Sequence, residues 1–155
     1  MPVALLTALH ATTVVLWIGG VAFVTIIVFP MLLRMEDSLE KVMFFQGVES
    51  RFARHARIYA WLTGLTGGGL LYATGRHADL FSARGIGITV MLIVWLVYIV
   101  VLTFERRLFA ILFKPDQSEN TARIFARLSS FHWIVLGLSL LAVVIGVWEG
   151  HGGRL

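Results

Sequence analysis

Five histidines are the side chains of this sequence best suited to hold a metal ion or a cofactor. They are His10, His55, His77, His132 and His151. The chain has no cysteine, which excludes disulfides, iron–sulfur clusters and thiolate metal sites. Any redox chemistry therefore needs a bound cofactor, and imidazole nitrogen is the ligand at hand to bind one.

His10 stands out among the five because it lies inside a long apolar segment. The segment runs from Val3 to Leu33, and His10 is its one ionisable side chain. An imidazole in a segment of membrane length is costly unless it has a partner, so His10 is a candidate for function. The alternative is a structural histidine that hydrogen-bonds a threonine or serine of a neighbouring helix.

The composition of the chain predicts a membrane protein. Of its 155 residues, 58% are hydrophobic and 14% are charged, and the mean hydropathy is +0.85, far from the values of soluble domains. Four apolar runs each come near the roughly 20 residues that cross a membrane as a helix: Val3 to Leu33, Ile58 to Thr74, Ile86 to Phe104 and Phe131 to Trp148. We therefore expect an all-α fold, an integral membrane four-helix bundle of one domain, 1–155, with helices at about 3–33, 50–76, 85–113 and 123–149.

Two of the predicted loops are rich in basic residues. The loop after the first run carries Arg34, Lys41, Arg51, Arg54 and Arg57, and the loop after the third carries, among others, Arg106, Arg107, Arg123 and Arg127. The positive-inside rule places both loops in the cytoplasm and both termini on the non-cytoplasmic side. We expect a multi-pass protein of a bacterial-type inner membrane, surrounded by lipid, and no nucleic-acid partner, because topology accounts for the net charge of +4.

The predicted topology brings histidines to similar depths in the membrane. His55 and His132 lie toward the cytoplasmic side, and His10 and His77 lie toward the outer side. A haem b needs axial imidazoles at matching depth on helices that face each other, so one or two haems are expected. We take His10, His55 and His132 as candidate metal ligands and His77 as a further cofactor ligand. Because imidazole also binds copper and zinc, copper is the alternative cofactor.

Arginines accompany the cytoplasmic histidines. Arg54 is next to His55 in the sequence, and Arg127 precedes His132 by a little more than one helical turn. Guanidinium groups bind carboxylates well, so Arg54 and Arg127 are candidates to hold haem propionates or an acidic substrate. An inert position at the membrane surface is the alternative for His55 and His77.

The first helix also carries a recognisable pattern. Leu9-His10 is followed by Trp17-Ile18-Gly19-Gly20 and then by an apolar stretch that ends at Pro30. This pattern resembles the opening helix of the CopD-like membrane domain of copper-resistance proteins, and it is similar to that of the HemJ-type protoporphyrinogen oxidases, small four-helix membrane proteins associated with haem b. Arg51-Phe52-Ala53-Arg54, before the second apolar run, extends the resemblance. The resemblance implies that His10 is a functional histidine.

Three functions are compatible with these features. The preferred hypothesis is a haem-b-binding membrane oxidoreductase, which passes electrons between a quinol, a porphyrinogen or a small oxidant and a partner redox protein. The first alternative is a CopD-like module that handles or transports copper with His10 as a ligand. The second is a non-enzymatic anchor or helper subunit with structural histidines. A homo-oligomer is compatible with all three.

Overall fold

The computed structural model describes residues 3–112 and 121–153, and all regular secondary structure within these ranges is helical. The elements in chain order are α1 (Val3–Phe23), the π-helix η1 (Val24–Val28), α2 (Phe29–Arg34), α3 (Leu39–Ala73), the 3-10 turns η2 (Arg76–Asp79) and η3 (Ala83–Gly85), α4 (Ile86–Leu112) and α5 (Thr121–Gly150). The predicted all-α fold is confirmed.

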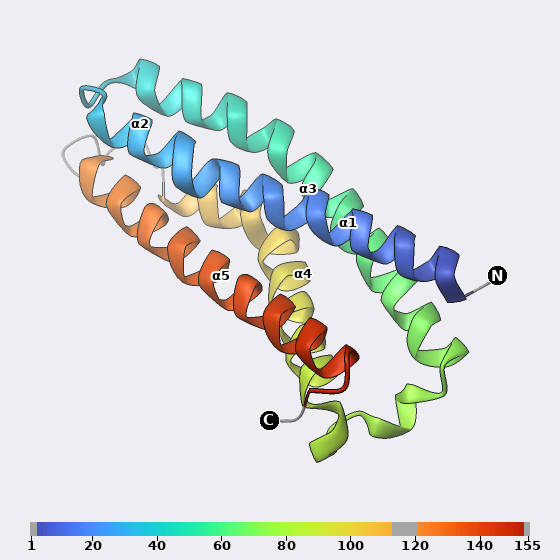
Figure 1. Ribbon diagram of the computed structural model, residues 1–155. Coiled ribbons are helices and arrows are strands. Elements are labelled where there is room, and N and C mark those ends of the chain that lie inside the picture. Colours follow the sequence, from blue (N-terminus) through green and yellow to red (C-terminus); the bar gives the residue numbers. More distant parts are fainter. Residues whose placement is uncertain (1–2, 113–120, 154–155) are drawn as a thin grey trace.

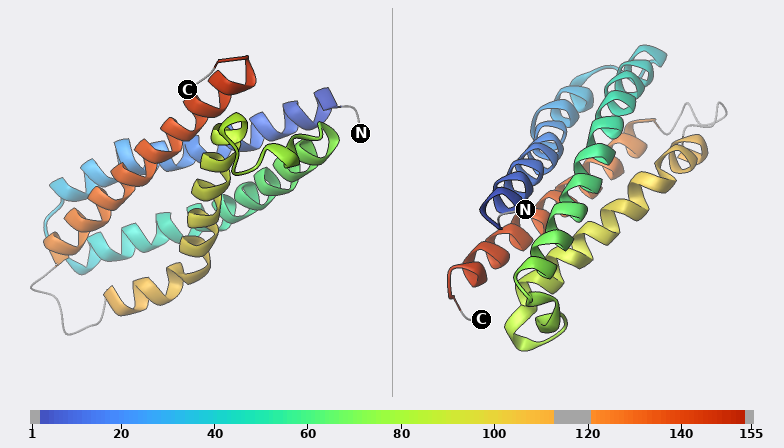
Figure 2. Two further views of the ribbon diagram at one scale, coloured as in Figure 1. Left: turned by 90° about the horizontal axis from the view of Figure 1, so that it is seen from below. Right: turned by 90° about the vertical axis from the view of Figure 1, so that its right-hand side faces the viewer.

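The long helices pack side by side. α3 runs back along the whole length of α1 and α2, and α5 lies next to the same helix pair (Figure 1). α4 packs on α5 and on α3 and bends along its length (Figure 2). In α4 the Thr103 hydroxyl donates a hydrogen bond to the carbonyl of Ile99 at 2.6 Å, a contact that commonly bends helices. The α2–α3 turn lies at one end of the molecule, and the α3–α4 connection and the end of α5 lie at the other (Figure 1).

Three helical segments of the described chain are long and apolar enough to cross a membrane. They are Val3–Arg34, Ala83–Phe104 and Thr121–Gly150. These segments support a membrane protein. α3 is not among them, because its second half contains glycines, threonines and tyrosines and its first half is charged.

α3 begins earlier than the sequence suggests. Its N-cap is Ser38, whose hydroxyl accepts a hydrogen bond from the amide of Lys41, a common way to begin a helix. The charged segment that precedes the second apolar run thus forms the first part of this helix. The helix ends at Ala73, and Gly75 follows with a φ of 72°, a conformation that glycine adopts readily. The end predicted for the third helix at residue 113 lies outside the described residues.

The π-helix η1 has a cause in the sequence. Pro30 has no amide hydrogen, and in a regular helix its ring would clash with the carbonyl of Ile26. The chain avoids this clash by widening: the amide of Phe29 donates to the carbonyl of Val24, five residues back. Pro30 is thus preceded by a π-turn that leads into α2.

Two groups of buried hydrophobic residues hold the helices together. The Trp17 cluster joins α1, α3, α4 and α5, and its members are Trp17, Val21, Ala56, Ala60, Tyr98 and Leu136. The Phe29 cluster lies nearer the α2–α3 turn, and its members are Val24, Val28, Phe29, Leu32, Phe45 and Phe125. η1 therefore begins where one cluster gives way to the other.

Candidate functional site

His10 lies in the interface between α1 and α3. Its Nδ1 is 3.1 Å from the carbonyl oxygen of Thr63 and 3.1 Å from the hydroxyl oxygen of Thr66. A carbonyl oxygen only accepts hydrogen bonds, so we assign the imidazole proton to Nδ1. The Nε2 of His10 then keeps a free lone pair, which can accept a proton or bind a metal ion.

A glycine of α3 makes room for the His10 ring. A Cβ atom on Gly67 would lie 3.0 Å from Cε1 of His10, which is closer than an ordinary van der Waals contact. The Gly-rich middle of α3 therefore allows the imidazole to lie against the helix backbone. The His10 side chain thus points toward α3.

His132 lies on α5 and is half-buried. Its Nδ1 is 2.9 Å from the carbonyl of Leu128, so the same argument leaves Nε2 with the lone pair. The ring packs against Phe29 with 4.6 Å between the ring centroids. His132 is therefore held by a backbone acceptor on its own helix and by an aromatic ring of α2.

The other three histidines lie on exposed positions. His55 and His151 each direct Nδ1 to the carbonyl four residues earlier, at 2.9 and 2.8 Å. His77 lies in η2 with its ring stacked at 6.2 Å from that of Tyr72. Within the described residues no ring contact joins two histidines, and no group of three metal-binding side chains of His, Cys, Asp or Glu forms.

The two arginines predicted beside the cytoplasmic histidines are exposed. Neither Arg54 nor Arg127 forms an ion pair with a carboxylate of the described residues. Both guanidinium groups are therefore exposed candidates for an anionic ligand.

Buried polar residues near the α2–α3 turn were not predicted as site residues. The rings of Phe29 and Phe45 are 5.6 Å apart, and those of Phe45 and Phe125 are 5.2 Å apart. Four positions from each ring, toward the middle of the molecule, lies a buried polar residue: Thr25, Glu49 and Ser129. The spacing of four residues on three helices is the signal that could have indicated this polar layer.

Lys41 is also buried in this region, with 2% of its surface exposed. Its Nζ donates to Oδ1 of Asp37 at 2.8 Å and to the carbonyl of Met35 at 3.2 Å. The ammonium group also lies 5.1 Å from the centre of the Phe125 ring. Lys41 thus fastens the α2–α3 turn to α5.

Several buried polar groups lie in and beside the Trp17 cluster. The Tyr98 hydroxyl and the Ser139 hydroxyl are hydrogen-bonded at 3.1 Å, and the Trp17 ring meets that of Tyr98 edge-on at 4.5 Å. The Nε1 of Trp17 and the Oγ1 of Thr63 are buried without a hydrogen-bond partner among the described residues. The tryptophan of the Trp-x-Gly-Gly pattern therefore serves the packing of four helices.

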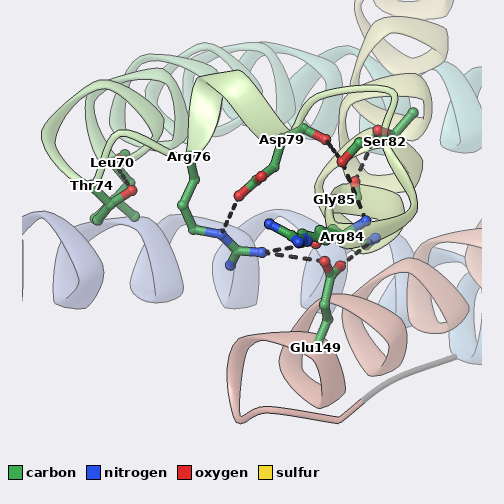
Figure 3. Close-up of polar contacts among 10 residues, drawn as sticks. Leu70, Thr74, Arg76, Asp79, Ser82, Arg84, Gly85 and Glu149 are labelled. Atoms are coloured by element: carbon green, nitrogen blue, oxygen red, sulfur yellow. Dashed lines mark hydrogen bonds and ion pairs between the residues drawn. The ribbon is translucent and has the colours of Figure 1, made fainter.

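At the end of the molecule opposite the α2–α3 turn, the carboxylate of Glu149 joins α5 to the start of α4 (Figure 3). Glu149 accepts hydrogen bonds from Arg76 Nη2 at 3.2 Å and from the amide of Gly87 at 2.5 Å. The amide belongs to the first turn of α4, where a negative charge is favourable. Arg76 also donates to the carbonyl of Arg84, so the α3–α4 connection takes part in the same network.

Searches of protein-family models, curated proteins and solved structures find no match to this chain. The fold and the candidate site define a helical protein with membrane-length apolar segments. Two of its histidines are half-buried and fixed by hydrogen bonds.

Proposed function

We propose that the chain is a four-helix membrane bundle with α3 as the fourth span. The part of α3 from Ile58 onward has no charged residue, and its outward-facing apolar side chains, among them Ile58, Trp61 and Leu65, are 52, 54 and 68% exposed. Such a surface is suited to lipid. With the basic residues near the α2–α3 turn in the cytoplasm, both termini lie on the non-cytoplasmic side of a bacterial-type inner membrane.

Within this membrane bundle we propose a redox function that depends on haem b. The observation that carries this proposal is that His10 and His132 are each anchored through Nδ1, which leaves Nε2 free. Ligating histidines are usually oriented in this way, because the second hydrogen bond fixes the ring and raises the basicity of the ligating nitrogen. His132 would bind a haem toward the cytoplasmic side and His10 a haem toward the outer side.

A bound haem b would supply one-electron transfer between a quinol, a porphyrinogen or a small oxidant and a partner protein. The residues of this chain position the two candidate histidine ligands: Phe29 packs on the His132 ring, and Gly67 leaves room beside the His10 ring. His55 lies on the outward face of α3, and His132 faces Phe29. For His55 and His132 to bind one haem, or for His77 and His10 to bind another, the exposed ring of His55 or His77 would have to turn toward its partner.

An absorption spectrum of the protein purified after expression with ample haem tests the proposal. We expect a Soret band and a reduced-minus-oxidised difference in the visible region. His132→Ala and His10→Ala should each reduce the haem content. His151→Ala is the matched control, because His151 has the same Nδ1 contact at an exposed position.

Other outcomes would point to other functions. A protein without a Soret band that contains copper, and loses it in His10→Ala, would replace haem by copper handling. Unchanged cofactor content in His10→Ala, His55→Ala and His132→Ala would leave a helper or anchor subunit with structural histidines.

A further inference from the structure

One face of α3 carries basic and apolar side chains in an exposed strip. The strip consists of Arg51, Arg54, Ile58, Trp61 and Leu65, which are all exposed. At about 100° per residue, these five positions fall within about 80° of arc. We call this set the α3 strip.

The α3 strip is exposed, although the Trp61 ring also meets the Trp95 ring of α4 edge-on, with 6.2 Å between the ring centroids, and 54% of the Trp61 surface stays exposed. The buried residues Ala53, Ala56 and Ala60 occupy the opposite face of α3, and Ala56 and Ala60 belong to the Trp17 cluster. No carboxylate of the described residues forms an ion pair with Arg51 or Arg54. Two exposed positive charges therefore lack a counter-ion supplied by the described part of the chain.

These two charges lie beside an apolar neighbour. A Cβ atom on Gly20 of α1 would meet the ring of Phe52, so the backbone near Arg51 and Arg54 is level with the middle of the first apolar segment. From Gly20 that segment continues without a charged side chain as far as Leu33. Because the uncharged part of α3 that we propose as a span begins at Ile58, Arg51 and Arg54 lie at its border, where an arginine head can meet an anion at the membrane surface.

The direction of the side chains fits this requirement. Side chains of a helix point toward its N-terminus, so the guanidinium groups of Arg51 and Arg54 extend toward the α2–α3 turn. Ile58, Trp61 and Leu65 follow in the opposite direction over about 10 Å. The strip thus offers two anion-binding groups at its head and an apolar track behind them.

We propose that the α3 strip binds one anionic phospholipid molecule. Arg51 and Arg54 bind its phosphate, for which the planar guanidinium group is well shaped, and an acyl chain lies along Ile58, Trp61 and Leu65. The two positive charges favour a lipid with net negative charge over a zwitterionic one. The proposal is independent of the cofactor.

Lipid titration of the purified full-length chain in detergent, followed by native mass spectrometry, tests the proposal. The probes are phosphatidylglycerol and phosphatidylcholine. We expect phosphatidylglycerol to bind more tightly, and Arg51→Gln/Arg54→Gln to weaken its binding about 30-fold, since each basic residue near an anionic surface contributes about fivefold. The matched control is Arg34→Gln/Arg123→Gln, which removes two exposed charges near the same end of the molecule.

A second measurement follows the acyl chain. Phosphatidylglycerol with brominated chains should quench the tryptophan fluorescence of the wild type more than that of Trp61→Phe, because bromine quenches at short range. Equal losses of affinity in the two arginine double variants would overturn the proposal, since a general surface charge would then explain binding. Loss of haem with unchanged lipid affinity in Arg51→Gln/Arg54→Gln would also overturn it, because the arginines would then serve haem propionates.

Discussion

The contact between Glu149 and the start of α4 should contribute measurably to stability. The Glu149 side chain is 14% exposed, and its carboxylate accepts from the Gly87 amide and from Arg76. A hydrogen bond to a charged group is worth about 1.5–3 kcal/mol. The Arg76 side chain is 36% exposed, so its ion pair with Glu149 should add only about 0.5–1 kcal/mol.

These magnitudes predict an asymmetric double-mutant cycle. Glu149→Ala should lower the free energy of unfolding by about 3 kcal/mol, because it removes both contacts. Arg76→Ala should lower it by about 1 kcal/mol, and the double variant should cost about 1 kcal/mol less than the sum. Glu149→Gln keeps one acceptor for the Gly87 amide and should fall between the two single alanine variants.

Reversible unfolding in mixed detergent micelles gives these free energies. Arg84→Ala is the matched control, because it removes a positive charge from the same connection without touching the side chain of Glu149; its effect should stay within about 0.5 kcal/mol. Equal costs for Glu149→Ala and Arg76→Ala that add without coupling would refute the reasoning, since the carboxylate would then not bridge the two groups.

Two further pairs of variants test the packing of α3. Gly64→Ala should lower the free energy of unfolding by about 1–3 kcal/mol, because the new Cβ would collide with the Trp95 ring, whereas Gly68→Ala, with open space around it, should raise it by up to about 1 kcal/mol in the same unfolding assay. Asp37→Ala should lower the free energy of unfolding by about 2 kcal/mol or more, because it leaves the buried ammonium of Lys41 without its carboxylate. Lys41→Met should lower it by less than about 1 kcal/mol, because Asp37 is 44% exposed and water can solvate it. A larger loss in Lys41→Met than in Asp37→Ala would contradict this assignment.

The helical architecture could be predicted because long apolar runs allow few other structures. The start of α3 was harder to predict: because Glu36 to Arg57 contains many charges, the second helix was expected only from about residue 50, and the charged segment before it is an extension of that helix. The structure has the extension, because Lys41, Phe45 and Glu49, spaced by four residues, all turn inward. Which face of a segment turns inward depends on the helices packed against it, and the sequence of that segment alone does not contain this information.

Only part of the candidate site was predictable, because its geometry also depends on how neighbouring helices pack. A partner for His10 on another helix was one of the expectations, and the contacts with Thr63 and Thr66 provide it. The positions of His55 and His132 along their helices follow from counting residues. The direction of each ring depends on the rotation of each helix about its own axis, which residue counting does not give. The role of Glu149 was missed because its partners are 62 and 73 residues away in the chain.

The π-helix η1 changes which side of the first apolar helix faces the interior. A π-turn holds one residue more than an α-turn, so the chain beyond it is rotated by about 100° relative to an uninterrupted helix. Trp17 before the turn and Phe29 after it can therefore both face the interior. In a regular helix of the same length, Phe29 would be turned by about 100° and would leave its cluster. Deletion of one residue between Val24 and Val28 would restore a regular helix and keep Trp17 and Phe29 on one face, so the π-turn is what allows this segment to hold one residue more than a regular helix needs.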